Sequence, residues 1–495
     1  MAVLWRRSVF ARNHLGFALG PLLLRLASKS RHPADPPPLL IELFPRKDSQ
    51  GDWDSESYPF CYRVRERGGI PQYEIGCHVS TDLVLKLRGA VNEASLGLDP
   101  EEVEPLTFGR LIEVLRQRST ERLASRGVKG MIRELSELAA FEAVGLSRVY
   151  AFAKDENVSE LFVDSEDTPV YLDHSVAGRC ESGILLTERE RNALETHLDT
   201  FSGYTLDFET PSLKNDVVIG GALLRVSLDL EPVSVSRFAL DVRRLNLTSL
   251  PMHRLIDLNV LSQEAGATLV GWLEVGGNVT IVGETSTGKT TLLNALDELV
   301  ERRLRRVYIE DAVETRDMLE RGFHQMKVKV DPFDRGYETG RTKESEIVKA
   351  LHRSPDIVIL SEIQSEEHSR AFFQALASGA RGLQTFHAST IEQAIRRWVS
   401  MHHISEQSLL DLGLMVQMAR PDRLKQARFV QRICQVIQDR GTPKLKELYL
   451  RDRDFKLRRI AGGGWPAPPE GTDPSEFGLT IERARRRIEN SRDEG

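Results

Sequence analysis

The sequence is poor in cysteine and has no strong excess of charge of either sign. Its 495 residues include four cysteines, and none forms a Cys-x-x-Cys pair, so zinc and redox sites have no support. Buried thiols in a reducing compartment are the ordinary interpretation. Lys and Arg total 67 against 73 Asp and Glu, and a net charge of −6 does not indicate a general polyanion binder. The length suggests about two to four domains.

Long apolar runs are also missing. Residues 1–29 are basic and free of acids, but the apolar stretch 15–24 is interrupted by Gly16, Gly20 and Pro21. About 10 residues are too few to cross a bilayer, which needs about 20. Three interpretations stay open for this start: a disordered or wrongly assigned segment, an arm on a membrane surface, and a targeting segment. We therefore expect any work at a membrane to go through a partner.

The order of patterns along the chain predicts an α/β protein in several parts. A basic, Pro-ended flexible segment precedes an accessory region of strands and then helices, and an α+β domain with its linker follows. Alternating strands and helices then indicate a mostly parallel sheet covered by helices. A Gly- and Pro-rich break precedes an Arg-rich end, expected to be a flexible tail or a solvated helix. The expected boundaries are 1–38, 39–146, 147–250, 251–461 and 462–495.

The most informative motif follows an apolar strand at 278–282 and precedes a helical pattern. It is Gly283-Glu284-Thr285-Ser286-Thr287-Gly288-Lys289-Thr290, with Thr291 opening the helix. This is the P-loop in its strand–loop–helix context, where glycines let backbone N–H groups face phosphates and the helix N-terminus adds partial positive charge. We expect Lys289 on the β- and γ-phosphates and Thr290 on Mg²⁺. The motif predicts that residues 283–291 bind ATP with Mg²⁺; a chance match in a loop is the alternative.

Two later strands end in side chains that suit phosphate chemistry. The apolar strand 356–360 delivers Glu362, and the strand 383–386 ends in His387. A carboxylate beside a P-loop can orient the attacking water and Mg²⁺-bound waters, and an imidazole there can sense the γ-phosphate. Both are candidate catalytic residues. The alternatives are a surface acid and a structural histidine.

Another strand, 307–309, ends in acids. Glu310 and Asp311 follow it directly, and Glu314 comes shortly after. Ligands of open α/β sheets bind at the carboxyl ends of strands, which makes Glu310 a candidate catalytic residue. Asp311, like Glu362, is a candidate partner of Mg²⁺ through water. A solvated turn is the alternative.

Four blocks therefore occur in order, at 283–290, 308–311, 355–362 and 385–388. They resemble the Walker A, Asp box, Walker B and His box of the type II/type IV secretion ATPase superfamily, and most closely its archaeal branch of archaellum and pilus assembly motors. The resemblance covers roughly residues 150–455. It implies a RecA-like motor domain preceded by a smaller N-terminal domain.

The resemblance also implies how such a motor works. It implies a homohexameric ring that hydrolyses ATP to drive filament assembly or secretion, in the cytoplasm against a membrane platform protein. Family arginines from the N-terminal domain and linker close over the nucleotide, and Arg225 and Arg243 match those positions. Guanidinium groups suit that work because they bind phosphate bidentately. Surface salt bridging is the alternative for both.

The chain also departs from the family pattern. Arginine, glycine or histidine of the family is replaced at Ser354, Ser361, Gln364, Ser365 and Ala380. We hypothesise that the neighbouring Arg353 and Arg381 take over the role of the missing cations. The set Lys289, Thr290, Glu310 and Glu362 is intact.

Two other functions remain open. A degenerate regulator would bind ATP and oligomerise but hydrolyse little, which the replaced arginines and histidine favour and the intact Glu362 and Glu310 oppose. A nucleic-acid translocase is the second, because RecA-like rings also move DNA. The mildly acidic balance, with no basic stretch interleaved with aromatics, argues against it.

Overall fold

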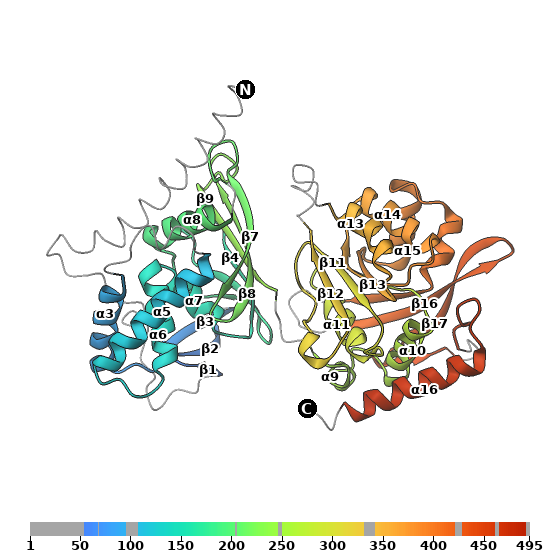
Figure 1. Ribbon diagram of the computed structural model, residues 1–495, viewed down its shortest axis with the longest axis horizontal. Coiled ribbons are helices and arrows are strands. Elements are labelled where there is room, and N and C mark those ends of the chain that lie inside the picture. Colours follow the sequence, from blue (N-terminus) through green and yellow to red (C-terminus); the bar gives the residue numbers. More distant parts are fainter. Residues whose placement is uncertain are drawn as a thin grey trace. The chain divides into compact units, whose positions relative to one another are not determined.

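The computed structural model describes residues 54–67, 69–95, 107–202, 205–245, 250–330, 342–420, 428–460 and 465–491. The chain divides into two compact units, Met1–Leu247 and Thr248–Gly495, each shown as a ribbon in Figure 1. The basic segment 1–38 lies outside the described residues. Among the helices of the described part, none combines the length and apolarity that a membrane crossing requires.

The first unit is built on a nine-stranded sheet with the order β1-β2-β3-β6-β5-β4-β9-β8-β7. Neighbouring strands are antiparallel except β3 and β6, which pair in parallel at Gln72 and Glu181. The strands are β1 (Ser55–Ser57), β2 (Phe60–Arg67), β3 (Ile70–Cys77), β4 (Val158–Val163), β5 (Tyr171–His174), β6 (Gly178–Glu181), β7 (Ser212–Ile219), β8 (Ala222–Leu230) and β9 (Phe238–Arg244). The pairing of β3 with β6 joins strands from the two regions that were expected to be separate.

Helices gather on one side of this sheet (Figure 1). They are α3 (Thr81–Ser95), α5 (Phe108–Ser125), α6 (Ile132–Val144), α7 (Ser147–Ala153) and α8 (Glu188–Ser202). A capping box opens α8: Glu190 accepts from the Thr187 N–H at 2.9 Å, and the Glu190 N–H donates to Thr187 Oγ1 at 3.3 Å.

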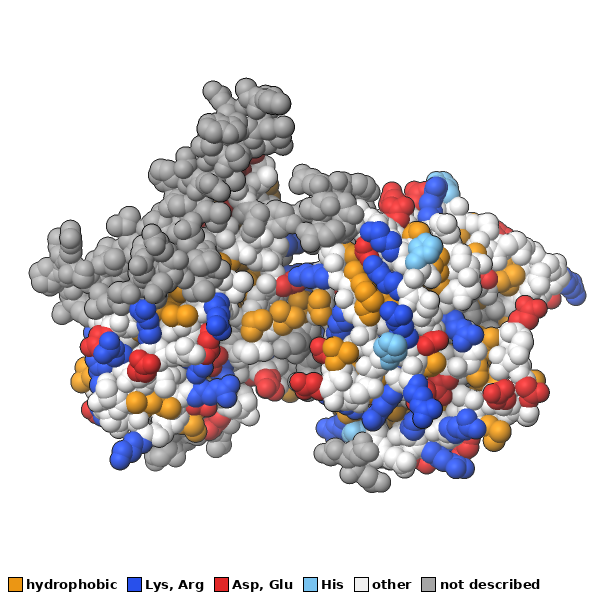
Figure 2. Space-filling model, in the orientation of Figure 1, with side chains coloured by type: hydrophobic (Ala, Val, Ile, Leu, Met, Phe, Trp, Pro, Cys, Tyr) orange, Lys and Arg blue, Asp and Glu red, His pale blue; other side chains and the backbone are white. Residues whose placement is uncertain are grey.

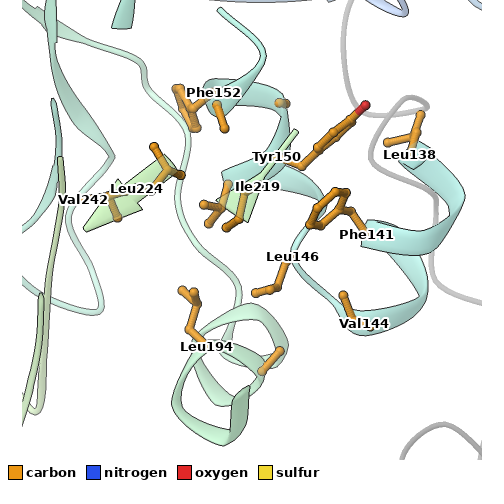
Figure 3. Close-up of a cluster of buried hydrophobic side chains, with 14 of the residues drawn as sticks. Leu138, Phe141, Val144, Leu146, Tyr150, Phe152, Leu194, Ile219, Leu224 and Val242 are labelled. Atoms are coloured by element: carbon orange, nitrogen blue, oxygen red, sulfur yellow. The ribbon is translucent and has the colours of Figure 1, made fainter. Parts of the chain in front are cut away.

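The expected boundary at residue 146 falls inside one hydrophobic core. Figure 3 shows Phe141 of α6 close to Leu146 and Tyr150, with Leu194 of α8 and Ile219 of β7 around them. The rings of Phe141 and Tyr150 stack with centroids 4.6 Å apart. The segments 39–146 and 147–250 therefore form a single unit where they are described, because the helices of the first cover the sheet of the second.

The second unit carries a nine-stranded sheet with the order β12-β11-β13-β14-β10-β15-β16-β17-β18. Pairing from β12 to β15 is parallel, and β15 to β18 is antiparallel. The strands are β10 (Val279–Gly283), β11 (Arg306–Glu310), β12 (Gln325–Lys329), β13 (Ile357–Ile363), β14 (Gly382–His387), β15 (Leu414–Ala419), β16 (Phe429–Asp439), β17 (Thr442–Arg451) and β18 (Leu457–Arg459). A mixed α/β protein with two large sheets results.

Helices cover both faces of this second sheet (Figure 1). One face carries α9 (Met252–Asp257), α10 (Gln263–Glu274), α11 (Lys289–Leu299) and α16 (Pro474–Asn490), and the other carries α13 (Lys343–Ala350), α14 (Glu366–Ala377) and α15 (Ile391–Arg396). Alternate residues of one strand enter different cores: Ile281 of β10 packs with the first group of helices and Val282 with the second. Burial on both faces explains why these strands are continuous apolar runs. Short 3-10 turns lie at Leu319–Arg321, Leu351–Arg353 and Glu406–Leu412, and a π-helical turn lies at Arg397–Met401.

The last described segment forms a helix that packs within the second unit. Helix α16 begins at an Asp473 N-cap and packs along α10, and Phe477, Ile481, Ala484 and Ile488 are buried there. The expectation of a flexible tail over 462–495 is therefore wrong for Pro474–Asn490. Arg483, Arg485 and Arg486 are exposed, while the apolar residues recur at helical spacing on the inner side.

Candidate nucleotide site

The phosphate-loop strand lies at the centre of the second sheet. β10 pairs in parallel with β14, and its last residue, Gly283, lies opposite His387. β13 is the next strand beyond β14, and β11 the next beyond β13. Because all these strands run in the same direction, Gly283, His387, Glu362 and Glu310 come to one edge of the sheet.

Backbone geometry between β10 and α11 depends on two glycines. Gly288 has φ +87°, in the left-handed region where a side chain is strained. A Cβ on Gly283 would lie 2.5 Å from Thr287 Oγ1, which itself donates to the Glu284 carbonyl at 2.8 Å. Ser286 has φ 60°. The chain thus curls tightly over the start of α11, where free N–H groups and the helix dipole favour an anion.

Lys289 lies folded into this loop. Its Nζ donates to the carbonyls of Gly283 at 2.9 Å and Glu284 at 2.8 Å, and lies 3.3 Å from His387 Nδ1. The other ring nitrogen of His387, Nε2, contacts the carboxylate of Glu362. The structure therefore brings Lys289, His387 and Glu362 into one contiguous chain of polar contacts.

The carboxylate of Glu362 is held from two sides. Gln364 Nε2 donates to Oε2 at 2.6 Å, while His387 contacts Oε1. Burial works to raise the pKa of Glu362, but the hydrogen bond and charge of His387 outweigh it, so the pKa lies below its ordinary value. Glu362 is thus a carboxylate at neutral pH. A carboxylate at this position can accept a hydrogen bond from a water molecule.

Thr290 and the acids after β11 form a second group. Thr290 Oγ1 donates to Glu314 Oε2 at 2.9 Å. Glu310 is only 1% exposed, and it accepts from the N–H groups of Glu314 and Thr315 and from the Thr315 hydroxyl at 2.7 Å. Burial raises the pKa of Glu310. Glu310 therefore holds the loop that presents Glu314, and Glu314 is the acid of this strand end that contacts the P-loop helix.

Asp311 is paired with a buried lysine. Lys343, at the start of α13 and 2% exposed, donates to Asp311 Oδ1 at 3.0 Å and to the Glu362 carbonyl at 2.8 Å. Its ammonium thus ties the strand end of β11 to that of β13. Asp311 has a structural partner here in addition to its expected role toward Mg²⁺.

The residues present fit a nucleotide phosphate with Mg²⁺. Mg²⁺ prefers oxygen ligands and is usually bound by one or two protein groups together with substrate phosphates. The Thr290 hydroxyl, with the Glu314 carboxylate against it, offers that donor set beside the loop. In the described part of the chain, no cluster of three or more His, Cys, Asp or Glu could hold a metal alone. The site thus suits a metal that arrives with its phosphates.

Four arginines singled out from the sequence have other surroundings within their own unit. Arg225 and Arg243 belong to the first unit, where they pair with Asp216 at 2.9 Å and Glu160 at 3.5 Å. Arg353 and Arg381 precede β13 and β14, at the amino ends of those strands, whereas Glu362 and His387 lie at the carboxyl ends. Strands of these lengths, at about 3.3 Å per residue, keep Arg353 and Arg381 from the phosphate edge of their own chain. Within one chain, Arg353 and Arg381 therefore do not reach this edge, and the hypothesis that they replace the missing cations between subunits stays a prediction.

Sequence reasoning missed two cations that hold this edge together, Lys343 and Arg397. Arg397 donates to the backbone carbonyls of His387 and Gln364. No local motif marks either residue, because their roles come from contacts between segments far apart in sequence.

Comparisons with known proteins point to one family. A family model described as "Type II/IV secretion system protein" matches residues 214–453. An uncharacterised protein of Methanocaldococcus jannaschii is 30% identical over 204 residues, which are 40% of this chain and 72% of that protein. The type IV pilus assembly ATPase TfpB of Acinetobacter baylyi is 31% identical over 147 residues, 28% of this chain and 23% of its own length. The chain belongs to the type II/type IV secretion ATPase superfamily.

The family match covers parts of both units. It begins in β7 of the first unit, includes Arg225 and Arg243, and runs past the P-loop, Glu362 and His387 to the end of β17. The chain spans only 30% and 32% of the length of two other Methanocaldococcus jannaschii relatives. Among solved structures, the Legionella pneumophila ATPase DotB is 17% identical, with 60% of this chain and 81% of that chain covered and a TM-score of 0.42.

Proposed function

We propose that this chain is an ATP-hydrolysing motor with a RecA-like second unit, which powers assembly of a type IV-like filament or protein secretion. The observation that carries the proposal is the chain of contacts from Lys289 through His387 to Glu362 at one sheet edge. Lys289 and the start of α11 bind the phosphates of ATP, and Thr290 with Glu314 receives Mg²⁺. Glu362 orients the attacking water, and His387 connects it to the phosphate end of the loop.

The larger assembly is part of the same proposal. It is a homohexamer in the cytoplasm that works against a membrane platform protein, in the manner of the archaeal-type motors that the four motifs resemble. Arg225 and Arg243 then exchange their carboxylate partners for nucleotide phosphate. The Arg243–Glu160 pair, with the arginine about half exposed, is the one held weakly. Rigid-body steps between ATP-bound and ADP-bound subunits would move the platform.

The test is ATP turnover and oligomeric mass of the purified chain. We expect wild type to hydrolyse ATP, Lys289→Ala to lose binding, and Glu362→Gln to bind ATP·Mg²⁺ as a ring with turnover reduced at least about a hundredfold. Lys349→Ala is the matched control, because Lys349 is exposed on α13 and pairs only locally with Glu346 at 2.8 Å.

Two outcomes would contradict the motor. If wild type and Glu362→Gln bind ATP equally well and are equally slow, the chain is an ATP-responsive regulator. The replacements at Ser361, Gln364 and Ala380 would then explain the slow turnover. If DNA stimulates turnover in a salt-dependent way, the translocase interpretation gains support. Figure 2 argues against that, since Lys and Arg side chains are interspersed with Asp and Glu on the displayed face of the second unit.

A further inference from the structure

The strand ends that carry Glu362 and His387 are joined by an irregular ladder. β13 and β14 pair in register up to Leu360 and Gln384, the register then shifts, and pairing resumes only at Ile363 and Phe386. Glu362 lies inside this shifted stretch. A bulge re-aims side chains, but it also removes ladder hydrogen bonds that would hold them in place.

Arg397 supplies a connection just past the last ladder pair. Gln364 and His387 are the residues that follow Ile363 and Phe386 on their strands. Arg397 Nη1 donates to the His387 carbonyl at 3.0 Å, and Nη2 donates to the Gln364 carbonyl at 2.9 Å. The guanidinium of Arg397 therefore bridges the two strand ends just beyond the last pair of the β-ladder.

The Arg397 guanidinium is itself held in place. Arg397 Cζ lies 5.1 Å from the centroid of the Phe386 ring, and Phe386 is fully buried against Trp398 with ring centroids 4.4 Å apart. Arg397 also opens the π-helical turn Arg397–Met401, a local irregularity of the kind that often accompanies functional sites. A planar guanidinium suits this bridge, because its rigid fork fixes the direction of both donors, whereas a lysine ammonium is a point charge on a flexible stem.

We propose that Arg397 is a positioning residue of the nucleotide site, which sets the distance between the Glu362 carboxylate and the His387 imidazole. The inference rests on the proposed function, because positioning matters only if these two groups act on ATP. Arg397 makes no contact with the P-loop in the described structure, so its loss should affect turnover more than nucleotide binding. Misplacing reacting groups by about 1 Å can cost about a hundredfold in rate.

The experiment compares Arg397→Lys and Arg397→Gln with the same two changes at Arg396. Arg396 is its exposed neighbour and the last residue of α15, so it controls for charge and for helix propensity. We expect both Arg397 variants to lower kcat by about ten- to a hundredfold with the Kd for ATP within about threefold. Both Arg396 variants should stay within about twofold of wild type.

A double-mutant cycle separates positioning from general support. In a His387→Ala background, Arg397→Lys should cost clearly less than it does alone, because one of the two groups that it positions is gone. Equal costs in both backgrounds would overturn the proposal. The proposal would also be overturned if wild type is active and the Arg397 variants are as active as the Arg396 variants. It would likewise be overturned if the Arg397 variants lose ATP binding and thermal stability together. A wild type without any ATP turnover would instead overturn the proposed function, and this inference with it.

Discussion

At the scale of single residues, the acid that matters to Thr290 is not the one that the strand pattern favours. Glu310 ends the strand, but it is buried and accepts hydrogen bonds from Thr315 in the loop that follows. Glu314 lies four residues further and reaches the Thr290 hydroxyl. A sequence can place both near the site, but only the course of the loop decides which carboxylate faces the helix.

Glu314→Gln should therefore weaken the use of Mg²⁺. A carboxylate that accepts the hydrogen bond of the Thr290 hydroxyl would orient the Thr290 oxygen toward the metal. Removing such a partner typically costs about tenfold in metal affinity. We expect the Mg²⁺ concentration for half-maximal ATP turnover to rise by about that factor, while ATP binding without Mg²⁺ stays unchanged. Glu320→Gln, on the exposed turn Leu319–Arg321, is the control. A Mg²⁺ dependence equal to that of the control would show that Glu314 has no part in the metal site.

Much of the site was predictable at this scale. The P-loop, Glu362 and His387 each sit directly after an apolar strand, and parallel strands bring their ends to one edge, so the sequence places these residues together. The partners of those residues were not predictable. Lys343 and Arg397 contribute through hydrogen bonds to backbone carbonyls, which any residue possesses, so no pattern of side chains announces them.

At the scale of elements, the sequence of α16 contains an apolar pattern at helical spacing, but charged residues between the apolar ones made it easy to overlook. Its buried Phe477, Ile481, Ala484 and Ile488 follow helical spacing, while three successive arginines occupy 485–487 between them. Arg487 pairs with Glu274 of α10 at 2.7 Å, and the rings of Phe477 and Trp272 meet edge to face at 5.9 Å. Helix α16 is therefore part of the core of the second unit.

The crossing of α10 and α16 depends on a glycine. A Cβ on Gly271 would lie 2.8 Å from Ile481 Cγ1 and 3.1 Å from the Ile481 backbone, so Gly271→Ala must push the helices apart. We expect a loss of about 1–3 kcal/mol in stability, seen as a fall of several degrees in Tm. Gly478→Ala, on the exposed side of α16 with nothing within 4 Å, should instead raise stability by about 1 kcal/mol. Equal shifts for both variants would show that the close packing at Gly271 is unimportant.

At the scale of the whole molecule, composition and periodicity divided the first half of the chain wrongly. The pairing of β3 with β6 joins Gln72 to Glu181, which are 109 residues apart. Tyr73 on β3 donates to Asp155 at 2.8 Å, and Arg244 on β9 donates to the Asp155 carbonyl at 2.9 Å. Local patterns indicate whether a segment is a helix or a strand, but not which distant strand it pairs with. The sequence therefore predicted two regions where the structure has one unit.

The cores of the two units are separate, and this predicts how fragments behave. The buried cluster of the first unit ends at Val242, and the clusters of the second begin at Met252. Residues 248–495 should therefore fold cooperatively alone and bind ATP, as measured by urea denaturation and nucleotide titration. A fragment 147–495 is the contrasting case, because it removes α6 and the first three strands and takes Phe141, Val144 and Leu146 from the core that also holds Leu194 and Ile219 (Figure 3). We expect that longer fragment to aggregate. If 147–495 instead folded as well as the full chain, the accessory region would be a separate domain after all, and the shared sheet would contribute little to the stability of the first unit.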